Sequence, residues 1–221
     1  VRMVASQFGI DSDLALGPAL ALGASESTLI DMAGSYAGIL NGGSTVEPYG
    51  ITELRLLGEA DPLMMIDSGI GERVIQEDAA RQLVWMMEKV ITEGSGRRAA
   101  LPDRQAAGKT GTTQAARDAW FVGFTADYVA AVWMGYDDNT PLTGVTGGGL
   151  PAEIWRETMV RVHEGLPPRA LPMSPPAGAA HLRDGPGGSG TGGSLLERML
   201  RDILGGGTGS GSGSGQPAAS R

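Results

Sequence analysis

The chain has 221 residues and carries 17 Lys and Arg against 25 Asp and Glu, which gives a formal net charge of −8. Because nucleic-acid binding needs a basic face to neutralise phosphates, this balance argues against a nucleic-acid partner. The absence of cysteine excludes disulfides and thiolate catalysis. The two histidines, His163 and His181, lie too far apart for a metal site, and we predict neither a metal nor a cofactor.

The first ten residues, VRMVASQFGI, predict a short amphipathic helix that ends at Gly9. The chain starts at Val1 inside this apolar pattern, without a residue that could cap the helix. We therefore interpret it as part of a longer protein. No apolar run reaches the roughly 20 residues that a membrane helix needs, so any anchor or export signal is expected outside this chain.

A second helix is predicted over residues 25–43, where Ser25 or Ser27 could cap it and Thr28 with Asp31 resembles a capping box. Its apolar positions recur at helical spacing and predict a buried stripe. The stripe consists of Leu29, Ile30, Ala33, Tyr36, Ala37 and Leu40.

Residues 44–75 alternate short β-like pieces with Gly, Pro and Asp, and we expect a small β excursion there. Residues 76–94 then predict a third helix, which is amphipathic, with acids at the start and Gly94 at the end. Its predicted apolar face is Ala80, Leu83, Val84, Met87, Val90 and Ile91.

After Pro102 the apolar period changes from that of a helix to that of a strand. Residues 104–113, 119–125 and 128–136 predict three strands of an antiparallel meander. Trp120, Val122 and Phe124 would share a face and pair with Val129, Ala131 and Trp133.

A loop at 139–149 leads to a last helix over 150–165, in which Pro151 suits the first turn. Helices followed by a meander and a final helix predict an α+β domain over residues 1–166. Residues 167–221 are rich in Pro, Gly and Ser and predict a disordered tail. Within it, 194–204 has the pattern of a short helix that either docks on the domain or a neighbour, or binds a dedicated partner.

Residues 108–113 read GKTGTT and contain one of the two lysines of the chain. A phosphate loop needs glycine five residues before Gly108, but Asp103 stands there, so we exclude that site. A plain turn fits less well, because two predicted strands follow and threonine favours extended structure. Glycines inside a strand let another backbone approach. The stretch therefore predicts a strand that binds an extended peptide and its carboxylate, against the alternative of an exposed lysine at a strand end.

Two other stretches partly resemble ligand-binding loops. The glycines at 147–149 lack the spacing of a dinucleotide-binding loop. Residues 137–139 (Asp-Asp-Asn) lack the glycine and the distal glutamate of a calcium loop. We interpret both as loop residues.

Four stretches occur in the order of a known family: ALGASESTLIDMAGSYAGILNGG, GKTGTT, DAWFVGFTADYVAAVWMGYDD and GGGLPAEIWRETM. Together, over about residues 1–165, they closely resemble the penicillin-binding transpeptidase domain, especially that of the bifunctional class A enzymes. The resemblance implies part of a fold like that of serine β-lactamases and penicillin-binding proteins, an antiparallel sheet flanked by helices.

The family crosslinks peptidoglycan: a serine of an S-x-x-K motif attacks a stem peptide that ends in D-Ala-D-Ala, and β-lactams mimic that substrate. By resemblance, Lys109 contributes positive charge, and Thr110 and Thr112 bind the substrate carboxylate through their hydroxyls. The Thr112 N–H would be one donor of the oxyanion hole, Gly111 would give clearance, and Thr113 would complete the substrate-binding set. Residues of a strand alternate between its two faces, which places Lys109 and Gly111 on one face and Thr110 and Thr112 on the other. For these residues to share one role, the strand must present its edge, as well as one face, to the cleft.

The two other motifs of the family, S-x-x-K and S-x-N, are absent from these residues. The positions of their serines are occupied by Met86 and Ala106 in the first case, and by Ile39 and Asp137 in the second. The chain therefore contains no nucleophile. We expect that residue in an upstream half of the same protein, and we expect this chain alone to be inactive.

Two rival interpretations remain: a catalytically silent module that binds peptide or cell-wall partners, and one chain of a cleaved enzyme. By resemblance, the parent protein is anchored in the cell membrane, with this domain on the periplasmic or extracytoplasmic side.

Overall fold

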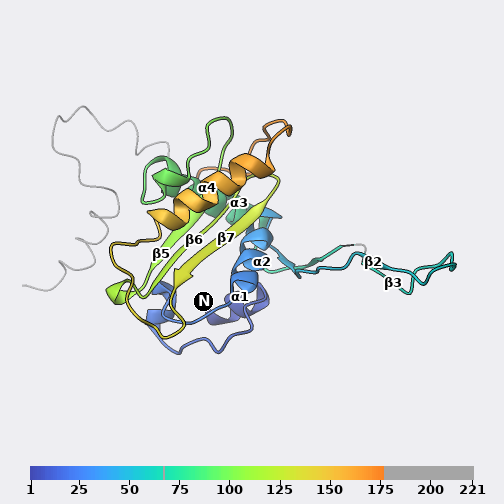
Figure 1. The fold of residues 1–221 in the computed structure, drawn as a ribbon, viewed down its shortest axis with the longest axis horizontal. Coiled ribbons are helices and arrows are strands. Elements are labelled where there is room, and N and C mark those ends of the chain that lie inside the picture. The colour runs from blue at the N-terminus through green and yellow to red at the C-terminus, as the bar shows by residue number, and fades with distance from the viewer. Residues whose placement is uncertain (67, 177–221) are drawn as a thin grey trace, which may run out of the picture. The chain divides into compact units, whose positions relative to one another are not determined.

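The computed structural model describes residues 1–66 and 68–176 (Figure 1). Its α-helices are α1 (Arg2–Gln7), α2 (Leu29–Leu40), α3 (Glu77–Thr92) and α4 (Leu150–Val162). Short 3-10 turns are η1 (Pro18–Leu22), η2 (Arg97–Ala99) and η3 (Gln114–Ala116). The strands are β1 (Ser44–Val46), β2 (Glu53–Leu54), β3 (Met64–Met65), β4 (Ile70–Arg73), β5 (Ala107–Thr112), β6 (Asp118–Phe124) and β7 (Val129–Gly135).

The main sheet has the order β5-β6-β7, and both of its strand pairs are antiparallel. This confirms the predicted meander and its pairing. The register places Trp120 opposite Trp133 and Phe124 opposite Val129. β5 is shorter than the stretch predicted for it, because its pairing with β6 begins at Ala107.

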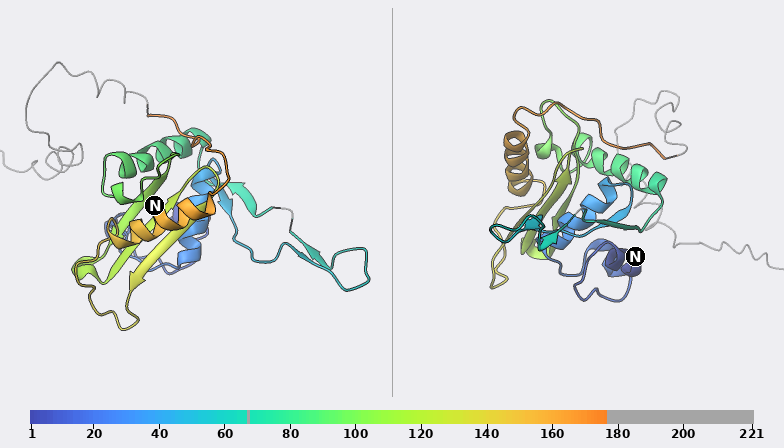
Figure 2. Two further views of the ribbon diagram at one scale, coloured as in Figure 1. Left: turned by 45° about the horizontal axis from the view of Figure 1, so that its top comes forward. Right: turned by 90° about the vertical axis from the view of Figure 1, so that its right-hand side faces the viewer.

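Helices cover both faces of this sheet: α4 lies on one side, and α2 with α3 lies on the other (Figure 2). On the α4 side, the rings of Phe121 and Trp155 meet edge to face at 5.3 Å, and both side chains are fully buried. The Trp155 indole N–H also donates to the Gly123 and Ala130 carbonyls, at 3.2 and 3.1 Å. On the other side, Phe124 meets Tyr36 of α2. The sheet is therefore held between two apolar layers.

Helix α2 begins at Leu29, with Thr28 as its N-cap, and the Asp31 N–H donates to Thr28 Oγ1 at 3.1 Å. The predicted apolar stripe is wrong at its start, because Leu29 and Ile30 are 40% and 58% exposed.

The face of α2 that is buried instead carries the small residues Gly34, Ser35 and Gly38. A Cβ atom on Gly38 would lie 2.5 Å from the Ser44 carbonyl oxygen, so only glycine lets the neighbouring chain come this close. The Ser35 hydroxyl donates to the Phe8 carbonyl at 3.1 Å. Close backbone approach, which hydropathy does not reveal, decides the orientation of this helix.

Helix α3 agrees with its prediction, since Ala80, Val84, Met87 and Ile91 are buried. The predicted β excursion at 44–75 is also present, as two separate antiparallel pairs, β1 with β4 and β2 with β3.

Residues 167–176 pack against the domain, although the sequence predicts a loss of order from Pro167. Leu171 is 5% exposed and belongs to the core cluster around Val84 and Phe124. Its N–H donates to Gln105 Oε1 at 3.0 Å, and the Ser174 N–H donates to the Arg81 carbonyl. The burial of Leu171 thus extends the packed part of the chain beyond Pro167, where the composition changes. The predicted helix at 194–204 lies outside the described residues.

The β2–β3 hairpin is short and apolar, and its side chains are exposed. Leu54 pairs with Met64, and only a few backbone hydrogen bonds extend the pairing, including Leu63 N–H to the Leu54 carbonyl at 2.7 Å. Two-stranded hairpins of this kind are marginally stable in water. The exposed apolar side chains near it are Ile51, Leu54, Leu56, Leu57, Leu63, Met64 and Met65.

We predict that the isolated chain self-associates at micromolar concentration, because exposed apolar clusters of this kind favour contact between copies. Replacing Leu57 and Leu63 with serine should reduce the apparent mass in size-exclusion chromatography with light scattering. The matched control replaces Leu16 and Leu22, which are exposed elsewhere, and should have a smaller effect. A monodisperse monomer across the concentration series would contradict the prediction.

Candidate functional site

The GKTGTT stretch lies on β5 and on the residue that follows it. Among the described strands, β5 pairs with β6 alone, so its other edge carries backbone groups with no strand beside them. An edge of this kind is a template for the addition of an extended peptide. Ala107 and Gly108 at the start of β5 are buried, whereas Lys109 and Thr112 are exposed.

The side chains on β5 divide between two faces. Lys109 lies opposite Val122, and Thr110 lies opposite Phe121. Cross-strand partners share a face of the sheet, so Thr110 is on the α4 side with Phe121 and Lys109 is on the other side. Thr112 shares the face of Thr110, which agrees with the parity expected from the sequence.

Both threonine hydroxyls have hydrogen-bond partners from neighbouring loops. Thr110 Oγ1 lies 2.7 Å from Ser95 Oγ, in the loop after α3. Thr112 Oγ1 accepts a hydrogen bond from the Gly147 N–H, at 3.0 Å, in the loop before α4. Two segments far from β5 in the sequence therefore orient its hydroxyls.

The glycines at 147–149 permit this contact. A Cβ atom on Gly147 would lie 2.4 Å from the Gly111 carbonyl oxygen, and one on Gly148 would lie 2.2 Å from the Ser95 carbonyl oxygen. Any side chain at either position would push the loop away from β5. These glycines form a loop, as predicted, but sequence reasoning missed their contact with the predicted site.

A second group of hydrogen bonds joins the two ends of the turn that follows β5. Thr113 and Asp118 exchange backbone and side-chain hydrogen bonds, including Asp118 N–H to Thr113 Oγ1 at 2.8 Å. Asp118 Oδ1 also accepts from the Trp133 indole N–H at 2.9 Å. The intervening Ala115 and Ala116 have φ values of 60° and 51°, which are uncommon for residues with a Cβ. The network fixes the end of β5, and sequence reasoning did not single out Asp118.

The environments of the two lysines differ. The Lys109 ammonium donates to the Thr110 carbonyl at 2.6 Å, and partial burial lowers the pKa of Lys109 below its ordinary value. Burial alone would also lower the pKa of Lys89, but hydrogen bonds to Glu93 and Glu88, with the charges of both, raise it. The pKa of Lys109 is thus shifted down and that of Lys89 is shifted up.

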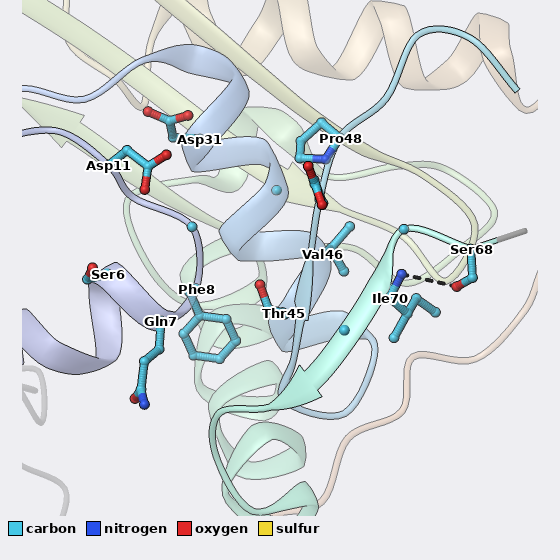
Figure 3. A pocket seen from close by; sticks show the side chains of 15 residues that line it. Ser6, Gln7, Phe8, Asp11, Asp31, Thr45, Val46, Pro48, Ser68 and Ile70 are labelled. Carbon is cyan, nitrogen blue, oxygen red and sulfur yellow. Dashed lines mark hydrogen bonds between the residues drawn. The ribbon is translucent and has the colours of Figure 1, made fainter. Parts of the chain in front are cut away.

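A cavity of about 420 Å³ lies elsewhere, between the end of α1, helix α2 and the β1–β4 pair (Figure 3). Asp11 and Asp31 stand near each other on one side of it, and Glu47 also lines it. None of Lys109–Thr113 contributes to its lining. Its acidic lining disfavours a carboxylate ligand.

Among residues 1–66 and 68–176, no three His, Asp or Glu side chains are grouped so that they could hold a metal ion. In the same residues, no helix has the length and apolar character to cross a bilayer.

The sequence matches the family model described as the penicillin binding protein transpeptidase domain over residues 7–160. The chain belongs to this family. It is 33% identical over 178 residues to penicillin-binding protein 1A of Aquifex aeolicus, covering 79% of this chain and 24% of that protein. It is 34% identical over 182 residues to penicillin-binding protein 2D of Bacillus subtilis, covering 79% of this chain and 26% of that protein.

Solved structures give the same assignment of the transpeptidase domain. The PonA1 protein from Mycobacterium tuberculosis in complex with penicillin V matches with a TM-score of 0.67 and 30% identity, over 76% of this chain and 50% of that one. Penicillin-binding protein 1A from Haemophilus influenzae matches with a TM-score of 0.66 and 29% identity, over 77% and 31%. The fold is α+β and like that of penicillin-binding proteins. The chain spans about a quarter of the length of the curated relatives named above.

We predict that Lys109 of the transpeptidase domain loses its proton at lower pH than Lys89 does. Only the neutral amine reacts with acylating reagents, so competitive acetylation from pH 8 to 11, read by peptide mass spectrometry, gives an apparent pKa for each lysine. The chain has only these two, so each serves as the control for the other. Equal midpoints, or a lower midpoint for Lys89, would contradict the description of the site.

Proposed function

We propose that the chain is the substrate-recognising part of a D,D-transpeptidase that crosslinks peptidoglycan stem peptides through a serine acyl-enzyme. The nucleophilic serine lies outside these 221 residues, in a segment that carries S-x-x-K. Its hydroxyl attacks the carbonyl carbon between the two D-Ala residues, and the terminal D-Ala leaves with a proton on its amine. An amine of a second stem peptide then takes the acyl group from the serine.

The observation that carries this proposal is the position of β5. A stem peptide that ends in D-Ala-D-Ala is extended and has a carboxylate at its end. The edge of β5 that has no strand beside it among the described residues offers backbone donors and acceptors to such a chain, and Thr110 and Thr112 place two hydroxyls on one face beside it. Hydroxyl donors to a carboxylate form charge-assisted hydrogen bonds, which are shorter and stronger than neutral ones.

Two further groups complete the proposed roles. The Thr112 N–H is one donor of the oxyanion hole, and the Thr113–Asp118 network holds its position at the end of β5. Lys109 supplies positive charge close to the strand and favours binding of an anionic substrate. Gly111 leaves room for the substrate backbone, and Thr113 belongs to the substrate-binding set through its place beside Thr112.

The second half of the catalytic domain is the partner that this proposal requires. β7 is the other edge of the described sheet, and the start of α2 exposes Leu29 and Ile30. Both are surfaces that an upstream half of the same protein would cover. We place that protein in the cell membrane, with this domain on the periplasmic or extracytoplasmic side. β-Lactams bind to it as substrate mimics.

We predict that fluorescent penicillin does not label the 221-residue chain covalently, and that it labels the longer protein in which S-x-x-K is present. In the longer protein, Thr112→Val should slow acylation about tenfold or more, because a charge-assisted hydrogen bond is lost. Labelling is measured by fluorescence after denaturing electrophoresis.

Thr143→Val is the matched control, since Thr143 is an exposed threonine of the loop before α4 and should leave labelling unchanged. A stable stoichiometric adduct on the 221-residue chain would overturn the claim that its nucleophile lies elsewhere. A longer protein that carries S-x-x-K and binds stem peptides but is never labelled would favour a catalytically silent binding module.

A further inference from the structure

Ser95 is held in a fixed place beside the proposed substrate-binding strand. It lies between Gly94 and Gly96 in the loop after α3. The Gly96 N–H donates to the Val90 carbonyl at 2.8 Å, and a Cβ atom on Gly96 would lie 3.1 Å from the Phe121 ring. The loop is therefore anchored both to the end of α3 and to the core of the sheet.

The hydroxyl of Ser95 is 2.7 Å from that of Thr110, a normal length for an O–H···O hydrogen bond. A Cβ atom on Gly148 would lie 3.6 Å from the Thr110 methyl group, so the methyl faces that glycine while Oγ1 faces Ser95. Threonine is branched at Cβ and has few rotamers, and these two contacts select one of them.

The direction of this hydrogen bond has a chemical consequence. A hydroxyl has one proton to donate, and an ionised carboxylate only accepts. If Thr110 donated to Ser95, it would have no proton for a substrate carboxylate. If Ser95 donates to Thr110, the Thr110 proton is free, and the acceptor role of Thr110 strengthens its own donation.

Thr112 offers a comparison within the same strand. Its oxygen accepts from the Gly147 N–H, and a backbone N–H can only donate. The direction of that bond is therefore fixed, and the Thr112 proton remains available. Thr110 has the equivalent arrangement only if Ser95 is the donor, because its partner is a side-chain hydroxyl that can act either way.

We propose that Ser95 is a positioning residue, which donates to Thr110 Oγ1 and so directs the Thr110 proton toward the carboxylate of the stem peptide or β-lactam. The inference rests on the proposed function, in which Thr110 binds that carboxylate. It adds a residue from outside the GKTGTT strand that sets the affinity for the anionic end of the ligand.

The test uses the longer protein that carries S-x-x-K and compares acylation by benzylpenicillin with acylation by its methyl ester, which lacks the carboxylate. Ser95→Ala should lower the second-order acylation rate for the acid about tenfold and leave the rate for the ester unchanged. Ser95→Thr keeps a hydroxyl at the same position and should restore most of the acid rate. The thermal midpoint of each variant is recorded, and because Ser95 is exposed, we expect little change.

Thr110→Val separates failure of this inference from failure of the proposed function. If Thr110→Val abolishes the preference for the acid but Ser95→Ala retains it, Thr110 binds the carboxylate without help from Ser95 and the inference is overturned. If Ser95→Ala slows acid and ester equally, Ser95 has a structural role only and the inference is also overturned. If Thr110→Val leaves the preference unchanged, the carboxylate role of Thr110 in the proposed function fails, and the inference fails with it.

Discussion

The close contact between β5 and the loop at 147–148 is the constraint on which the rest of the site depends. Within residues 1–66 and 68–176, β5 has a neighbouring strand on one side only, so contacts on its faces help to define its position. Gly147 and Gly148 approach the backbones of Gly111 and Ser95 so closely that neither position has room for a Cβ atom. This contact brings the Gly147 N–H to within 3.0 Å of the Thr112 hydroxyl oxygen.

Buried side chains of the core help to hold this contact in place. Phe121 is paired with Thr110 in the register, and the same ring packs against Trp155 of α4 and beside the loop that carries Ser95. Interiors packed at this density transmit small displacements, so a cavity at Phe121 would be expected to move the hydroxyls as well as lower stability. The strand proposed to bind the substrate and the folded sheet thus depend on the same buried residues.

The sequence predicted the meander, helix α3 and the strand that carries Lys109, because alternating and helical apolar periods are local signals. It did not predict the burial of Gly38 in α2 or the packing of Leu171, since both depend on neighbours distant in the chain. For the site, GKTGTT identified the strand, but Ser95 and Asp118 become visible only through tertiary hydrogen bonds. The carboxylate and oxyanion roles of Thr110 and Thr112 stay predictions.

A crystal structure of the longer protein acylated by penicillin V tests the central claim most directly. The account predicts the ligand carboxylate within hydrogen-bond distance, about 3 Å, of Thr110 Oγ1 and Thr112 Oγ1. It also predicts the acyl carbonyl oxygen at the Thr112 N–H, with the ligand lying along the free edge of β5. A ligand whose carboxylate contacts neither threonine, or which lies away from β5, would contradict it.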